Sequence, residues 1–207
     1  TAAWLGGVLN ALYGNGNYLD NIVTGTGGTM AGLVFRRNYT YHPRIAVGSY
    51  ARGLSLAQSG AVSGAIVEDS YHWGPDANGA AVHIGSDAGT VMTGNSLYGL
   101  LSGFTAAEFP SNTYETISPQ PSGVRVFVRA NTYEVGRGHV IVYNPGLGSS
   151  VSVDLSTVLV YGDTYKVFDA MNPFVAILEG TYGGGNVTFP MNLTTVLPPA
   201  GLAAPPH

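Results

Sequence analysis

The sequence predicts an all-β chain in which a short parallel β-helix is followed by a small antiparallel β-sandwich. Three observations predict this fold class. Glycine supplies 30 of the 207 residues and charged residues only 10%, against about 25% in an average soluble domain. A short motif recurs through the first half of the chain, and alternation of apolar and polar residues begins near residue 124.

The recurring motif is an Asn or Asp followed three residues later by Tyr or His. It occurs at Asn10, Asn38, Asp69 and Asn95, which are 28, 31 and 26 positions apart. Short strands that repeat at this spacing without helices between them favour a parallel β-solenoid, in which each repeat is one coil. An irregular β-sandwich is the alternative, but sandwiches usually place turn signals about every 8 to 12 residues. We expect Asn38, Asp69 and Asn95 to occupy equivalent positions in successive coils.

Alternation typical of half-buried strands marks the second half, at residues 124–128, 139–143 and 151–155. Turn sequences rich in Gly, Asn and Pro separate segments of this kind. The resulting domain prediction is coils over residues 1–105, a linker or capping segment over 106–123, the antiparallel sandwich over 124–197 and a Pro-rich tail over 198–207.

Composition disfavours several kinds of partner and chemistry. The chain has no cysteine, which excludes disulfides and thiolate chemistry. Its formal net charge is −4 and its largest basic cluster is the pair Arg36 and Arg37, so no nucleic-acid partner is expected. No apolar run reaches the roughly 18 residues that indicate a membrane span. Because the chain begins at Thr1 without an export signal, we expect its coils to be the C-terminal part of a longer helix.

The second half also carries a family resemblance. The segments that carry it are residues 133–144, 150–155, 162–167, 169–174 and 179–182. They resemble the C-terminal region of bacterial secreted right-handed parallel β-helix repeat proteins, and the resemblance covers about residues 113–191. It implies a right-handed, pectate-lyase-like helix that ends against a sandwich like those appended to many carbohydrate-active enzymes. It implies no reaction, because no catalytic motif can be carried over from this region.

Catalytic candidates are few. A glycosidase needs two carboxyls about 5 to 9.5 Å apart, but the adjacent Glu68 and Asp69 would point to opposite faces of a regular strand. A polysaccharide lyase would need a base, which an arginine can supply, and a cation such as Ca²⁺ held by several oxygen ligands. Acids are too sparse to assemble such a site, so we predict no metal and no cofactor and leave only Ca²⁺ open. Arg37 and Asp69 remain as candidate catalytic residues.

The recurring motif has a structural interpretation as well. Amide side chains stacked at a solenoid bend hydrogen-bond along the stack and to the turn backbone. The rings near the motif either pack in the core or face outward as a strip on which a sugar chain can lie. The candidate carbohydrate-binding residues are Tyr39, Tyr41, His72, Trp73 and Tyr98.

The function that these patterns favour is a non-catalytic extracellular module that gives structure, attachment or assembly to a carbohydrate-associated protein. Its expected partners are a polysaccharide or glycan surface and, at the open N-terminal end of the helix, upstream coils or another copy of the chain. The residues before Asn17 contain no charge and no proline, so they do not block such an edge. The alternative function is the C-terminal part of a polysaccharide lyase or glycoside hydrolase that acts on an extracellular polymer.

Overall fold

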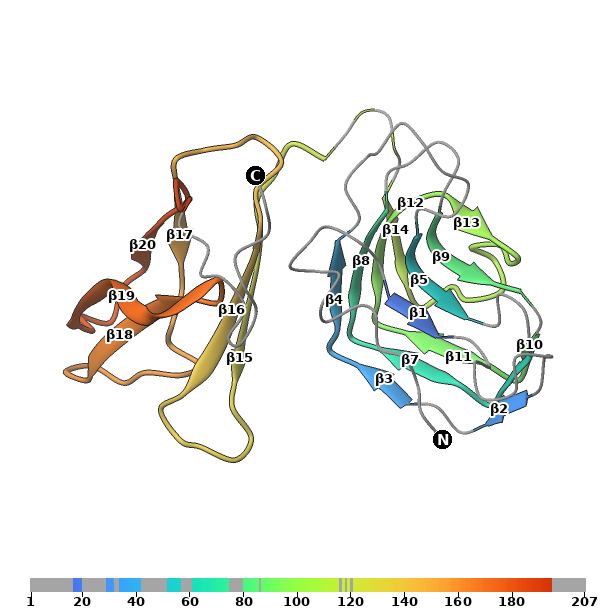
Figure 1. The fold of residues 1–207 in the computed structure, drawn as a ribbon, viewed down its shortest axis with the longest axis horizontal. Coiled ribbons are helices and arrows are strands. Elements are labelled where there is room, and N and C mark those ends of the chain that lie inside the picture. The colour runs from blue at the N-terminus through green and yellow to red at the C-terminus, as the bar shows by residue number, and fades with distance from the viewer. Residues whose placement is uncertain are drawn as a thin grey trace, which may run out of the picture. The chain divides into compact units, whose positions relative to one another are not determined.

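The computed structural model describes residues 17–19, 29–31, 34–41, 52–56, 61–74, 80–85, 87–115, 117, 119 and 121–194. The regular elements among these residues are all β-strands, which confirms the predicted all-β class (Figure 1). None of the described residues belongs to a helix long and apolar enough to cross a membrane. The chain divides into two compact units, Thr1–Pro121 and Ser122–His207.

The first unit is built from short strands. They are β1 (Asn17–Leu19), β2 (Thr29–Ala31), β3 (Val34–Arg36), β4 (Tyr39–Tyr41), β5 (Arg52–Leu56), β6 (Ala61–Ser63), β7 (Ile66–Glu68), β8 (Tyr71–Gly74), β9 (Ala80–Ile84), β10 (Asp87–Ala88), β11 (Val91–Thr93), β12 (Ser96–Gly99), β13 (Leu101–Ser102) and β14 (Thr113–Glu115). Glycine and polar residues separate most of them, so each strand ends after a few residues.

The strands of the first unit form parallel sheets with a regular order. The described sheets run β1-β5-β9-β13, β2-β6-β10, β3-β7-β11 and β4-β8-β12-β14. Up to β13, every fourth strand along the chain therefore joins the same sheet, and all of these pairings are parallel. β14 lies in the segment expected to link or cap the two parts, and it adds to the last sheet by pairing with β12.

The core of the first unit follows from this register. Phe35 of β3 pairs with Val67 of β7, which pairs with Met92 of β11, and all three side chains are buried. Their neighbours on each strand are exposed or half-buried, because successive side chains of a strand point to opposite faces. Leu54, Leu56, Val82, Ile84 and Leu97 complete the centre of the same cluster. This packing fixes the register, since a shift by one residue would turn the buried set outward.

The register corrects the expected alignment of the recurring motif. Arg36 pairs with Glu68 and Tyr39 with Tyr71, so Asn38 lies opposite Ser70 rather than Asp69. Thr93 pairs with Glu68 and Ser96 with Tyr71, which places Asn95 next to Ser70 as well. The prediction that Asp69 shares a column with Asn38 and Asn95 is therefore wrong by one residue. Asn10 lies outside the described residues.

The second unit contains antiparallel pairs. β15 (Arg125–Ala130) pairs with β16 (Gly138–Tyr143), β17 (Ser150–Val153) with β20 (Val187–Pro190), and β18 (Thr164–Asp169) with β19 (Asn172–Thr181). β17 alternates between exposed and buried residues, as its sequence predicts. The buried core of this unit consists of Val151, Val153, Leu155, Leu159, Tyr182 and Phe189.

Candidate functional site

A column of polar side chains runs across the bends of the first unit. It consists of Asn38, Ser70, Asn95 and Asn112 and is called the polar column below. The backbone N–H of each member donates to the side-chain oxygen of the next: Asn38 to Ser70 Oγ at 3.1 Å, Ser70 to Asn95 Oδ1 at 3.0 Å, and Asn95 to Asn112 Oδ1 at 3.0 Å. Each bend is thus fixed by a side chain from the following repeat.

The two later asparagines make a second, equivalent bond. Asn95 Nδ2 donates to the carbonyl of Val67 at 2.8 Å, and Asn112 Nδ2 donates to the carbonyl of Met92 at 2.9 Å. Each of these carbonyls lies three residues before the preceding member of the polar column. Asn95 is 1% exposed, so its amide replaces the water that these backbone groups would otherwise need. The side chains of the polar column therefore form hydrogen bonds to the backbone, as the structural interpretation of the asparagines expected.

The candidate catalytic residues Arg37 and Asp69 lie beside the polar column. Both have exposed side chains and positive φ, 53° at Arg37 and 49° at Asp69. Gly94, with φ 65°, occupies the equivalent position in the next repeat. Their N–H groups donate to the carbonyls of Glu68 and Thr93, so each marks the same bend in successive repeats. The structure thus brings these two residues to neighbouring positions. Glu68, the carboxylate that precedes Asp69 in the sequence, forms an ion pair with Arg36.

Three of the five candidate carbohydrate-binding rings are buried. His72, Trp73 and Tyr98 are 0%, 5% and 2% exposed, and Tyr39 is half-buried. Trp73 and Tyr98 pair in register, which brings their ring centroids to 4.2 Å. The side chain of Tyr41 lies outside the described part of the chain. His72, Trp73 and Tyr98 pack within the first unit, so the expectation of an outward-facing strip is wrong for these three rings.

His72 is a fully buried titratable group in the described part of the first unit. Its Nδ1 lies 2.9 Å from Thr40 Oγ1, and its ring stacks on Phe35 with centroids 5.9 Å apart. Its Nε2 is buried and has no hydrogen-bond partner among the described residues. Desolvation by burial lowers the pKa of His72 from 6.5 to about 3, because a charged imidazolium would lose its water. His72 is therefore neutral at physiological pH.

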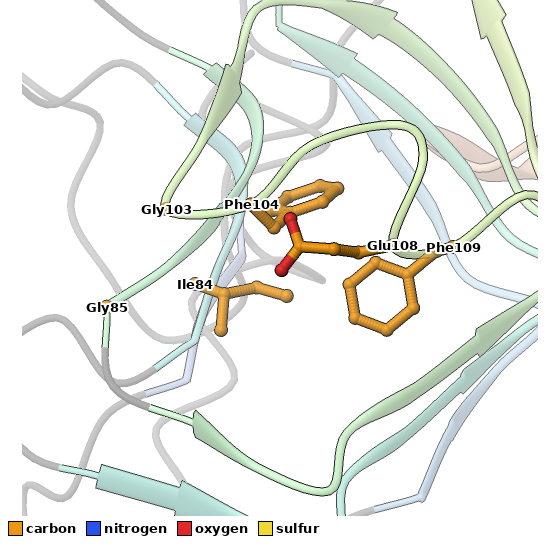
Figure 2. A pocket seen from close by; sticks show the side chains of 6 residues that line it. All are labelled: Ile84, Gly85, Gly103, Phe104, Glu108 and Phe109. Atoms are coloured by element: carbon orange, nitrogen blue, oxygen red, sulfur yellow. The ribbon is translucent and has the colours of Figure 1, made fainter.

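A pocket lies at the end of the first unit's core and is called the end pocket below. Its volume is about 260 Å³, and it is lined by Ile84, Gly85, Gly103, Phe104, Glu108 and Phe109 (Figure 2). The rings of Phe104 and Phe109 meet edge to face, with centroids 5.5 Å apart and planes at 70°. Figure 2 shows the Glu108 carboxylate on the same side of its turn as the two rings and Ile84.

A short turn holds this carboxylate in place. Oε2 of Glu108 accepts hydrogen bonds from the Thr105 N–H at 2.6 Å and from the Thr105 hydroxyl at 2.8 Å. These bonds, the one from the hydroxyl first, lower the pKa of Glu108, so it is ionised at neutral pH. Residues 105–108 read Thr-Ala-Ala-Glu, the spacing of a capping box. That spacing is the sequence signal that could have drawn attention to Glu108.

The backbone of the end pocket depends on one glycine. Gly103 has φ +84°, and a Cβ at this position would lie 1.7 Å from the carbonyl oxygen of Ile84. No other residue type can occupy this position unless the backbone at Gly103 or at Ile84 moves. The close approach of these backbones forms one wall of the end pocket.

Two further findings bear on function. Within the described parts of the chain, no group of three or more His, Asp or Glu side chains is arranged to hold a metal ion. No model of a known protein family, no curated protein and no solved structure matches the chain.

Proposed function

We propose that this chain is a non-catalytic extracellular module that gives structure, attachment or assembly to a larger carbohydrate-associated protein. In this proposal the first unit is a short right-handed parallel β-helix and the second is a β-sandwich, as in the bacterial secreted proteins that residues 113–191 resemble. The return of every fourth strand to the same parallel sheet supports the helical winding. The three antiparallel pairs around one apolar core support the sandwich.

The observation that carries a structural role is how the polar groups of the first unit are used. Asn95 is buried and makes hydrogen bonds to three neighbouring positions, and His72, Trp73 and Tyr98 are buried within the unit. Groups held in this way rigidify a fold but do not reach a polymer outside it. A polysaccharide partner would therefore contact other, exposed parts of the chain.

Assembly at the N-terminal end is part of the proposal. β2 and β3 each stand last in their sheet among the described strands. A strand edge presents unpaired N–H and C=O groups that recruit another strand. We propose that upstream coils of the same polypeptide or another copy of the chain continue these sheets.

Light scattering of the 207-residue chain tests this assembly. We expect species larger than the 21.5 kDa protomer, and smaller species for a Leu5→Lys/Leu9→Lys variant. Both leucines lie outside the described residues, so the variant tests a sequence-based expectation. Leu147→Lys is the matched control, because Leu147 is 88% exposed in the second unit and should leave the size unchanged. A monomeric parent chain would contradict the assembly.

One observation favours the alternative, in which the chain is the C-terminal part of a polysaccharide lyase or glycoside hydrolase. Arg37 and Asp69 are exposed neighbours, and residues in unusual backbone conformations gather at active sites. We expect no release of unsaturated or reducing ends from pectin or alginate, with or without Ca²⁺. Release that is lost in Arg37→Ala or Asp69→Ala protein would establish the enzyme instead.

A further inference from the structure

The hairpin of β15 and β16 has two faces that pack differently. One face carries four valines that pack against the core of the second unit: Val126, Val128, Val140 and Val142. Phe127 pairs with Ile141, and Tyr143 lies two positions further along β16. Because successive side chains of a strand point to opposite faces, these three residues share the face away from the valines. This face of Phe127, Ile141 and Tyr143 is called the ring face below.

The ring face is covered, although neither of the described core clusters includes it. Tyr143 is only 7% exposed, and Phe127 and Ile141 are half-buried. The two rings meet edge to face, with centroids 6.3 Å apart and planes at 88°, so each covers only one side of the other. A two-stranded ribbon cannot bury both of its own faces. Another segment of the chain therefore lies against the ring face.

The chain returns to the edge of the ring face just before residues 195–207, which lie outside the described residues and are called the C-terminal segment below. After β20, the N–H of Met191 donates to the carbonyl of Ser149 at 2.8 Å. Ser149 ends the turn that follows Tyr143, and Asn144 closes this turn by bonding to Gly148. The thirteen residues of the C-terminal segment reach up to about 40 Å when extended, and β15 spans about 20 Å. The segment is therefore long enough to cross the whole ring face.

We propose that the C-terminal segment docks on the ring face of its own chain and covers Phe127, Ile141 and Tyr143. Its sequence contains no Asp, Glu, Lys or Arg, so docking buries apolar surface without burying a charged side chain. Its four prolines lack N–H groups and favour an extended conformation of the kind that aromatic-lined surfaces bind. This inference goes beyond the proposed function and does not depend on the N-terminal assembly.

Limited nitration by tetranitromethane, followed by peptide mass spectrometry, measures the accessibility of each tyrosine. The second unit contains its own reference rings, because Tyr133 and Tyr161 are 97% and 82% exposed and Tyr182 in the core is 3% exposed. We expect Tyr143 to react as slowly as Tyr182 in the full chain. In a chain that ends at Thr194 it should react at least about tenfold faster, since the burial of one or two apolar side chains holds the face closed to that extent. The rates of the three reference rings should not change.

A full-length variant tests docking without removing residues. Leu197→Asp/Leu202→Asp places charges in the C-terminal segment and should raise the nitration rate of Tyr143 as truncation does. Leu193→Asp is the matched control, because Leu193 precedes the segment and is 40% exposed, and it should leave the rate unchanged. Nitration of Tyr143 as fast as that of the exposed tyrosines in the parent, or an unchanged rate in both altered chains, would overturn the proposal. A joint rise of Tyr143 and Tyr182 would overturn it too, by showing that the core opens. Protection that is lost on dilution would assign the cover to a second copy instead.

Discussion

At the residue scale, His72 links the stability of the first unit to pH. Its folded-state pKa is about 3, whereas an unfolded chain gives histidine its ordinary value of 6.5. Below pH 6.5 the unfolded chain binds a proton that the folded chain refuses, so protonation favours unfolding. The stabilising effect of a neutral His72 is therefore complete above pH 6.5 and is lost progressively as the pH falls toward 3.

We expect the free energy of unfolding to fall by about 2 kcal/mol between pH 7 and pH 5 from His72 alone, because each pH unit below 6.5 costs about 1.4 kcal/mol. Tryptophan fluorescence during urea unfolding measures it, since both tryptophans, Trp4 and Trp73, belong to the first unit. His72→Gln should remove most of this dependence. His139→Gln, at an exposed position of β16, should retain it. The same pH dependence in wild-type and His72→Gln protein would contradict the assignment.

The left-handed backbone at Arg37 leads to a second prediction. A residue with a Cβ at φ 53° loses about 1–2 kcal/mol relative to its preferred conformation, and Gly94 shows that glycine suits the same bend. Glycine also raises the conformational entropy of the unfolded chain, which offsets part of this gain. We therefore expect Arg37→Gly to raise the free energy of unfolding by a net value of about 0.5 kcal/mol. Arg36→Gly should lower it by about 1 kcal/mol, because Arg36 lies in β3 and pairs with Glu68. Urea unfolding distinguishes the two, and destabilisation by both substitutions would contradict the backbone argument.

At the scale of elements, the polar column joins one repeat to the next. Asn95→Ala would leave the buried Ser70 N–H and Val67 carbonyl without their side-chain partner, and each lost partner costs about 1–3 kcal/mol. We expect a total loss on the order of 3 kcal/mol in urea unfolding. Asn38→Ala is the matched control. The Asn38 side chain donates to the carbonyl of Arg36 two residues away, so its loss should cost less than about 1 kcal/mol. Equal costs would show that the column does not couple the repeats.

The same elements show what the sequence could and could not predict. Asn38 and Asn95 do share a column, because their flanking apolar residues Phe35 and Met92 both face the core. Asp69 was misaligned because the repeats differ in length, and a serine, Ser70, performs the column's role one position later. Serine is a common residue, so a single sequence does not indicate that Ser70 has this role.

The sequence likewise does not predict which aromatic rings are buried. A Tyr, His or Trp suits either face of a half-buried strand, so its own residue type does not decide exposure. In β8 all four residues are buried, so position along the strand does not decide which side chains are exposed. The end pocket was missed for a related reason: Gly103 and Ile84 are brought together by the pairing of β9 with β13, which a local motif does not reveal.

At the scale of the whole molecule, the chain builds two separate cores. The apolar cluster of the first unit extends from Phe35 to Tyr114, and that of the second from Val126 to Met191. Every described strand pairing joins strands of the same unit. Each unit thus has its own buried apolar surface, which is the physical requirement for folding alone.

We therefore expect residues 122–207 to fold when they are expressed without residues 1–121, and to unfold cooperatively in urea. In the full chain, Phe189→Ala should cost about 3–5 kcal/mol in the second unit, and Leu97→Ala about 2–5 kcal/mol in the first. Hydrogen exchange followed by mass spectrometry reports the second unit through peptides covering β17 and β20, and tryptophan fluorescence reports the first. Phe189→Ala should reduce protection in β17 and β20 without moving the fluorescence transition, and Leu97→Ala should do the reverse. Each substitution removes contacts inside one core only, so a loss that spreads to both readouts, or a chain of residues 122–207 without exchange protection, would show that the two cores do not fold independently.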